Sequence, residues 1–356
     1  MPHLFEPFTI KGITLRNRIG VSPMCQYSSV DGLANDWHLV HLGSRAIGGA
    51  GLVIVEATAV SADGRITPGD AGIWSDDHIP PLLRINRLVK QHGAVPGIQI
   101  AHAGRKASAS RPWEGGEHLD DSSGGWRTVA PSAEAFGDGL DKIPHALTIE
   151  EIAEVQQNFV DATRRSLVAG YEWLELHSAH GYLSHEFLSP LTNHRTDQYG
   201  GCFENRIRFL METVSATRAV WPDHLAFTVR LSCSDWVEGG WDIEQSIELS
   251  QKLKAAGVDL IDCSSGGAVP GAKIAIGPGY QVKFAERIRH EADIATAAVG
   301  MITDARQADE IVREGRGDVV LLARELLRDP YWPAHAAKIL GHEKAVLPPP
   351  QYARAW

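Results

Sequence analysis

Eight short apolar runs that alternate with stretches of helical periodicity constrain the fold of this chain more than any other feature. We predict buried strands at residues 19–23, 52–56, 95–100, 173–177, 226–231, 260–263, 294–299 and 319–322. Amphipathic helices are predicted at 150–169, 203–220, 243–256, 280–291 and 305–314. Eight strands with intervening helices fit an α/β fold of the (β/α)8 TIM-barrel type. A doubly wound sheet is the alternative, but no Gly-x-Gly-x-x-Gly motif follows the first strand.

Two segments lie outside this repeat, although we expect a single domain over residues 1–356. Residues 8–15, with Gly12 at the turn, should form a hairpin that plugs the lower face of the barrel. Residues 102–147, after the third strand, lack a strong period, and their centre at 114–125 is rich in Gly, Asp and Ser. Because long loops of this kind are usually functional, we interpret the segment as a cap over the barrel mouth. For its centre, a tolerated surface insertion is the alternative.

Composition limits the partners of the chain. Its 356 residues carry a formal net charge of −10 without a basic run, which argues against nucleic acid and anionic membranes. The apolar runs are too short to span a bilayer, and we expect no signal peptide. The four cysteines, at 25, 202, 233 and 263, form no CxxC pair. This usage is typical of a reducing cytoplasm and leaves no thiolate cluster for an iron–sulfur centre.

The sequence His177-Ser-Ala-His180-Gly-Tyr182 follows directly on the fourth predicted strand. TIM barrels keep their chemistry at the carboxyl ends of their strands. Two imidazoles can hold one oxygen by hydrogen bonds, and a tyrosine hydroxyl can release a proton. The motif suits a reaction that polarises a carbonyl group and then protonates carbon. A buried histidine pair and a zinc site are the alternatives at this point.

Polar residues also follow other predicted strands. They are Ser22 to Tyr27 after the first, Glu56-Ala57-Thr58 after the second, Gln99, His102 and Lys106 at the third, and Arg230 at the fifth. Gln99 and Arg230 would be costly in a barrel mouth without partners, so we expect a polar, partly anionic ligand or an internal Gln–Glu–Arg network. Gly300-Met301 and Ala323-Arg324 follow the last two strands, where such barrels often bind phosphate.

These features fit a barrel that binds a phosphate-bearing ligand, and flavin mononucleotide (FMN) satisfies them. An aldolase that forms a Schiff base is disfavoured because none of the eight strands contains a lysine. A zinc hydrolase is disfavoured because the chain has no His-Glu-x-x-His motif.

Motifs spread over the whole chain carry a family resemblance. They include residues 15–19 (LRNRI), 22–27 (SPMCQY), 64–67 (GRIT), 72–76 (GIWSD), 99–106 (QIAHAGRK), 193–201 (NxRxDxYGG) and 324–330 (RELLRDP), besides the histidine–tyrosine motif. With them the chain resembles the Old Yellow Enzymes, which are FMN-dependent ene-reductases, and specifically their bacterial xenobiotic-reductase-like or thermophilic-like subgroup. Two departures are Ala323 and Ala355, where the subgroup usually has glycine.

The resemblance implies a role for each residue named above. The flavin ring would contact Ser22, Pro23, Met24, Cys25, Ala57, Gln99 and Arg230, and the phosphate would contact Gly300, Met301, Ala323 and Arg324. His177 and His180 would hold the substrate carbonyl oxygen, and Tyr182 would donate a proton. Tyr27 would close over the substrate, Cys25 would tune the flavin, and Lys106 would lie near it.

The resemblance also implies an activity. NADPH or NADH would reduce FMN, and the reduced enzyme would then reduce the C=C bond of an α,β-unsaturated carbonyl compound in a ping-pong cycle. A desaturase that runs in the reverse direction and a flavin-binding sensor without turnover are the alternatives.

The C-terminal tail at 347–356 carries a further expectation. Three prolines at 348–350 should end the last helix and favour an extended exit. Tyr352, Arg354 and Trp356 are of residue types favoured at interfaces, whereas a frayed terminus is the alternative. In the subgroup that the chain resembles, the corresponding arginine crosses into the neighbouring subunit's active site. We therefore expect a homodimer or homotetramer in which Arg354 lines the substrate site of the next subunit.

Overall fold

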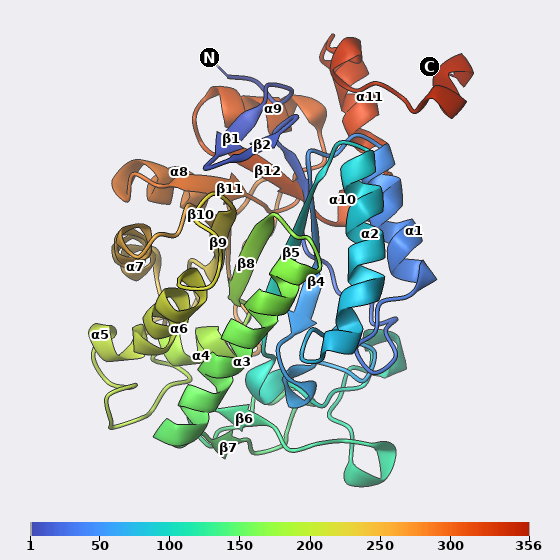
Figure 1. Cartoon of the computed structure of the whole chain (residues 1–356). Coiled ribbons are helices and arrows are strands. Elements are labelled where there is room, and N and C mark those ends of the chain that lie inside the picture. Colours follow the sequence, from blue (N-terminus) through green and yellow to red (C-terminus); the bar gives the residue numbers. More distant parts are fainter. Residues whose placement is uncertain (1, 356) are drawn as a thin grey trace.

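Eight parallel strands close into a barrel in the computed structural model, which describes residues 2–355 (Figure 1). The order around the barrel is β10-β11-β12-β3-β4-β5-β8-β9, and pairing of β9 with β10 closes it. The strands are β3 (Ile19–Val21), β4 (Leu52–Ala59), β5 (Val95–Ala101), β8 (Trp173–Ser178), β9 (Ala226–Ser232), β10 (Leu260–Ser264), β11 (Ala295–Ala298) and β12 (Val319–Leu322). The predicted (β/α)8 barrel is confirmed, because all eight predicted strands form it.

Helices cover the outside of the barrel (Figure 1). They include α1 (Asp36–Ile47), α2 (Ile79–Gln91), α3 (Ile149–Val168), α6 (Arg208–Arg218), α7 (Ile243–Ala255), α8 (Val282–Glu291) and α9 (Ala305–Arg313). The helix predicted over 203–220 is divided at Ile207 into α5 (Phe203–Arg206) and α6. The sequence did not predict α1, because Trp37 and Val40 are 56% and 67% exposed and blur its apolar face.

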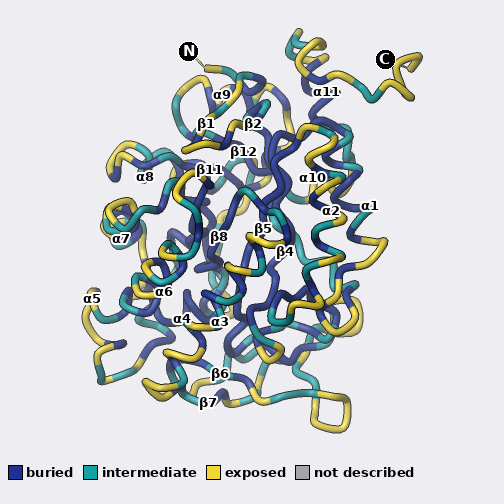
Figure 2. Tube along the Cα trace, viewed as in Figure 1, coloured by how far each residue is buried: buried dark blue, intermediate teal, exposed yellow. Residues whose placement is uncertain are grey.

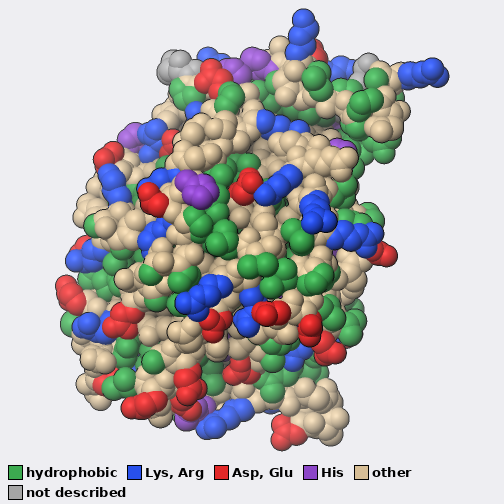
Figure 3. Space-filling view, viewed as in Figure 1, with side chains coloured by type: hydrophobic (Ala, Val, Ile, Leu, Met, Phe, Trp, Pro, Cys, Tyr) green, Lys and Arg blue, Asp and Glu red, His purple; other side chains and the backbone are tan. Residues whose placement is uncertain are grey.

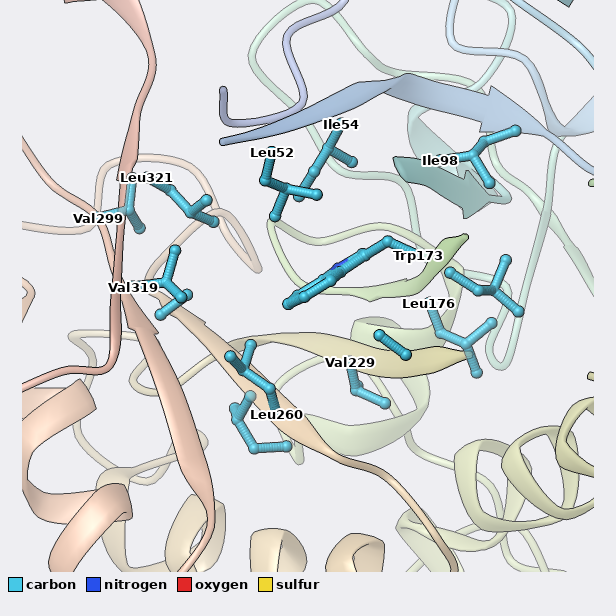
Figure 4. Packing of buried hydrophobic residues seen from close by; sticks show 14 of the residues in the cluster. Leu52, Ile54, Ile98, Trp173, Leu176, Val229, Leu260, Val299, Val319 and Leu321 are labelled. Atoms are coloured by element: carbon cyan, nitrogen blue, oxygen red, sulfur yellow. The ribbon is translucent and has the colours of Figure 1, made fainter. Parts of the chain in front are cut away.

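Apolar side chains fill the centre of the barrel, as Figure 4 shows for Leu52, Trp173, Leu260 and Val319. In Figure 2 the barrel strands are buried, and exposure is concentrated on the outer helices and loops. Trp173 is 1% exposed, and its indole N–H donates to Thr228 Oγ1 at 3.1 Å. A packed interior of this kind holds the strand ends in fixed positions, which a site built from those ends requires.

A hairpin of β1 (Phe8–Ile10) and β2 (Ile13–Leu15) precedes the barrel, as predicted. The N–H of Gly12 at its turn donates to the carbonyl of His224 at 2.9 Å. A Cβ on Gly12 would lie 2.9 Å from the same oxygen, so the close approach requires glycine here. Since His224 precedes β9, the hairpin lies at the amino ends of the strands (Figure 1).

The segment between β5 and α3 lies at the opposite end of the barrel from the hairpin (Figure 1). It contains β6 (Val129–Ala130) and β7 (His145–Ala146), besides three short 3-10 turns. Trp126 ties it to the connection after β4, because its indole N–H donates to the carbonyl of Asp63 at 2.9 Å. The sequence did not predict β6 and β7, since two residues are too few to show a period.

The C-terminal end differs from the prediction. After α10 (Arg324–Arg328), the last helix, α11 (Trp332–Ile339), ends well before the three prolines. Gly341, with a φ of +74°, follows it and lets the chain turn away. Pro350–Ala355 form a 3-10 turn instead of an extended exit, and proline tolerates the first position of such a turn. The tail projects from the body (Figure 1), whereas the interface residue expected at Trp356 lies outside the described residues.

The surface carries charges of both signs. Figure 3 shows acidic and basic side chains interspersed over the visible face. Within residues 2–355, no helix is both long enough and apolar enough to cross a bilayer.

Candidate active site

β8 carries His177 to the carboxyl end of the barrel, where it lies opposite Arg230 of β9. All six residues of β8 are buried, and His177 itself is 4% exposed. Its Nδ1 accepts the backbone N–H of Ala179 at 3.3 Å. A neutral His177 therefore carries its proton on Nε2, which lies 3.4 Å from Nδ1 of His180.

Three other segments hold His180. Its backbone has a φ of +60°, and its N–H donates to Ser232 Oγ at 2.9 Å. Its Nε2 lies 2.6 Å from Ser264 Oγ, and its carbonyl accepts a hydrogen bond from Lys106 Nζ at 2.8 Å. A left-handed backbone that several contacts hold in place is typical of a functional site.

Tyr182 completes the cluster. Its ring centroid lies 5.0 Å from that of His177, which lies 5.1 Å from that of His180. Burial, together with the charge of Arg230, lowers the pKa of both imidazoles well below their usual value. Burial also raises the pKa of the Tyr182 hydroxyl well above 10. At neutral pH the cluster therefore offers two neutral hydrogen-bond donors and one protonated acid.

A buried polar network lies next to this cluster in the barrel. Gln99 Nε2 donates to Glu175 Oε1 at 2.9 Å, and Arg230 Nε lies 3.1 Å from Asp262 Oδ2. Arg230 also donates to Ser22 Oγ at 3.2 Å. The internal network considered from the sequence is thus present, although its carboxylates come from Glu175 and Asp262. Burial raises the pKa of both carboxyls, and the charge of Arg230 opposes this shift at each of them.

A cavity of about 260 Å³ brings residues of the last strands together with Arg230. It is lined by Arg230, Ser264, Tyr280, Gln281, Val299, Gly300, Met301, Ile302, Thr303, Leu321, Ala323, Arg324, Glu325 and Arg328. All four predicted phosphate contacts, Gly300, Met301, Ala323 and Arg324, therefore line the same cavity. The sequence assigned no role to the lining residues Ser264, Tyr280, Gln281 and Arg328.

The shape and charge of this cavity fit the phosphate end of FMN. Gly300 and Met301 have φ values of +125° and +51°, which turn the backbone after β11. A Cβ on Gly300 would lie 3.1 Å from Gln281 Nε2, so glycine keeps this wall open. Arg324 and Arg328 supply two guanidinium groups, and Arg328 is paired with Glu325. Backbone turned in this way beside arginines is suited to a phosphate group.

The segment after β3 contributes Ser22 to Tyr27. Burial raises the pKa of the Cys25 thiol well above its usual value, and the charges of Asp70 and Glu56 add to this shift. Cys25 is therefore a neutral thiol and not a thiolate. Tyr27 has a φ of +50°, its carbonyl accepts a hydrogen bond from Arg111 Nε at 3.0 Å, and its ring lies 5.9 Å from that of Trp113.

The place expected for Arg354 is the substrate site of a neighbouring subunit. In its own chain Arg354 lies on the exposed 3-10 turn of Pro350–Ala355 and does not line the cavity. Across residues 2–355, no group of three or more His, Cys, Asp or Glu side chains is arranged to hold a metal ion.

Comparisons with known proteins agree with this picture. Residues 3–343 match the model of the NADH:flavin oxidoreductase / NADH oxidase family. The chain is 50% identical to an NADPH dehydrogenase of Geobacillus sp. (strain WCH70) over 355 residues, covering 99% of this chain and 98% of that protein. The Old Yellow Enzyme homologue from Zymomonas mobilis has a TM-score of 0.80 at 26% identity and covers 98% of both chains.

A second solved structure extends the comparison. A 2-naphthoyl-CoA reductase in complex with 2-naphthoyl-CoA has a TM-score of 0.85 at 27% identity, covering 96% of this chain and 53% of that longer one. The resemblance to the Old Yellow Enzymes is therefore confirmed. The chain belongs to the NADH:flavin oxidoreductase / NADH oxidase family and is an NAD(P)H-dependent oxidoreductase with FMN as its cofactor.

Proposed function

We propose that this enzyme reduces the C=C bond of α,β-unsaturated carbonyl compounds in a ping-pong cycle. The observation that carries the proposal is the cluster of His177, His180 and Tyr182, in which two neutral donors lie beside one protonated acid. This reaction needs such a set, because negative charge develops on the carbonyl oxygen and a proton is added to the α carbon.

FMN, when bound, would supply the two-electron chemistry that couples oxidation of the nicotinamide to reduction of the substrate at its β carbon. We assign its ring to Ser22, Pro23, Met24, Cys25, Ala57, Gln99 and Arg230, and its phosphate to Gly300, Met301, Ala323 and Arg324. The cation-lined cavity beside Arg230 supports this assignment. We assign the substrate to the side of Tyr27, with Lys106 supporting the backbone of His180.

The two histidines hold the carbonyl oxygen only if their protons face it. His177 already carries its proton on Nε2, because Nδ1 accepts from Ala179. For His180 to direct a proton toward the same oxygen from Nδ1, its Nε2 has to accept from the Ser264 hydroxyl, which lies 2.6 Å away. We propose that this contact sets the tautomer and makes Ser264 a positioning residue for the oxygen site.

The names of similar proteins support the reductive direction. The Geobacillus relative is named an NADPH dehydrogenase, and the structurally similar enzyme bound to 2-naphthoyl-CoA is named a reductase. We infer that NADPH or NADH serves as reductant and that the enzyme works in the cytoplasm, in keeping with the cysteine usage of the chain. The experiment that tests the proposal is the anaerobic reaction with NADPH and 2-cyclohexen-1-one, followed by identification of the product.

Replacing Cys25 by Ala should shift the reduction potential of the bound flavin and alter both half-reaction rates, with turnover retained. The reason is that a neutral thiol near the ring acts through hydrogen bonding and not as a nucleophile. Spectroelectrochemistry of the holoenzyme measures the shift. Complete loss of turnover with FMN still bound would show instead that the thiol takes part in covalent chemistry.

Deleting residues 351–356 should weaken assembly and raise the KM for the enone while FMN stays bound. We propose that the enzyme is a homodimer or homotetramer in which Arg354 reaches the substrate site of the next subunit. The tail is exposed in the single chain, as an element that docks on a partner would be. Mass in solution and steady-state kinetics check this, with Arg354→Ala as the matched single change. Unchanged mass and unchanged KM would contradict it.

A further inference from the structure

Tyr182 must recover a proton in each catalytic cycle. Under the proposed function, on which this inference rests, its hydroxyl gives a proton to the α carbon of the substrate. Burial, with the charge of Asp70, raises the pKa of Tyr182 well above 10. A tyrosinate is therefore costly at this position, and a second proton donor close to Tyr182 would remove the cost.

A small cavity next to Tyr182 connects it with such a donor. The cavity is lined by Ala57, Ala59, Gly64, Ile66, Asp70, Ala101, Ala103 and Tyr182. Its volume of about 10 Å³ gives room for one water molecule. Among the lining residues, Tyr182 and Asp70 are the two whose side chains can exchange a proton with that water.

Asp70 is fixed in a position suited to this role. It is 2% exposed, and its Oδ1 accepts from the backbone N–H and the hydroxyl of Thr67 at 3.0 and 2.8 Å. Its Oδ2 accepts from the N–H of Ile66 at 2.7 Å. Burial raises the pKa of Asp70 to about 7, although these hydrogen bonds act in the opposite direction. Both protonation states are therefore populated near neutral pH, which is the condition for efficient proton transfer.

The ionisable groups around Asp70 come from three parts of the chain besides Tyr182. Glu56 of β4 raises its pKa further, and Arg65 of the following connection is the nearby cation. Cys25 and Tyr27, after β3, are neutral because burial raises their pKa values. Among the groups whose pKa is shifted by this environment, Asp70 is the one with a pKa near 7.

We propose that Asp70 resupplies Tyr182 with a proton through one water molecule held in this cavity. As the Tyr182 O–H bond breaks and its proton goes to the α carbon, the water gives a proton to the Tyr182 oxygen. The carboxylic acid of Asp70 gives its own proton to the water at the same time. Asp70 is left as a carboxylate and takes a proton from solvent before the next turnover. The relay moves protons only, so it needs no oxidant or reductant of its own.

The test measures single-turnover reoxidation of the reduced holoenzyme by 2-cyclohexen-1-one as a function of pH. In the wild type the rate should fall as the pH rises through about 7, because Asp70 must be protonated. At low pH, Asp70→Asn should be reoxidised about tenfold or more slowly than the wild type. This loss should be smaller than the ~10²–10⁴-fold loss expected when Tyr182, the acid itself, is replaced. The fall in rate through about pH 7 should be absent in this variant, because the group that titrates there has been removed. Reduction by NADPH should remain at the wild-type rate.

Two further variants separate the relay from a structural role. Ala59→Val fills the cavity while leaving Asp70 in place, so it should reproduce the slowing and carries the test alone if Asp70→Asn does not fold. Asp77→Asn, an exposed aspartate on the same connection, is the matched control and should behave as wild type. In a Tyr182→Phe background, Asp70→Asn should slow reoxidation no further.

Three outcomes decide the matter. Wild-type rates and pH profile in both Asp70→Asn and Ala59→Val would overturn the relay. Undiminished slowing by Asp70→Asn in the Tyr182→Phe background would also overturn it, since the effect would then bypass Tyr182. If Tyr182→Phe alone were reoxidised at the wild-type rate, the proposed acid role of Tyr182 would fail, and the relay would fail with it. If the relay alone were wrong, the slowing by Tyr182→Phe would remain.

Discussion

Replacing Tyr182 by Phe should slow reoxidation of the reduced enzyme by an enone by about 10²–10⁴-fold, the range for loss of a positioned general acid. Phenylalanine keeps the ring that packs 5.0 Å from His177, so the change removes the acid and little else. Reduction by NADPH should change little, because that step takes no proton from Tyr182. Stopped-flow absorbance of the two half-reactions measures both rates.

A matched control is available near the amino end of β8. Tyr171 lies just before β8 and is 1% exposed, so Tyr171→Phe removes a buried hydroxyl far from the strand's carboxyl end. Its half-reactions should keep wild-type rates. Equal slowing of both half-reactions by Tyr182→Phe would instead assign that residue a structural or binding role.

Replacing His177 by Ala should lower kcat by about 10²–10³-fold, the cost of one donor at a developing oxyanion. The imidazole is buried and neutral, and its donor position is fixed by the bond from Ala179. His180→Ala should cost a similar factor. The double variant should lose less than the product of the two, because both rings act on one oxygen. Steady-state kinetics with saturating NADPH measure kcat and KM separately.

The exposed His290 of α8 offers the control, since His290→Ala removes an imidazole without touching the site. A rise in KM with unchanged kcat in His177→Ala would mean that the ring binds substrate and transition state equally. That result would contradict a role in stabilising charge on the carbonyl oxygen.

The barrel could be predicted because each of its strands is a nearly continuous apolar run. β4 and β5 are buried over their whole length, as strands between a filled core and covering helices must be. The histidine–tyrosine motif was found for a related reason, since polar groups stand out where such a run ends. α1 was missed because its exposed Trp37 and Val40 weaken the contrast between its two faces.

The partners inside the site were harder to predict. Glu175 and Asp262 lie within buried strands. For a polar residue in such a strand, the sequence does not indicate which way the side chain points or what it pairs with. A usable signal was nevertheless present, because alternate strand residues share a face. Glu175 lies two positions before His177, and Asp262 lies two positions before Ser264. Gln281 and Arg328 come from loops and a short helix, so only the folded chain brings them to the cavity.

The most direct test of the central claim is the product of the anaerobic reaction with NADPH and 2-cyclohexen-1-one, identified by NMR. The account predicts cyclohexanone, with one hydrogen at the β carbon derived from NADPH and one at the α carbon derived from solvent-exchangeable protons. Running the reaction in D2O should therefore label the α carbon, and NADPH deuterated at its transferable position should label the β carbon. Formation of 2-cyclohexen-1-ol, or oxidation of NADPH without any change in the enone, would contradict the account.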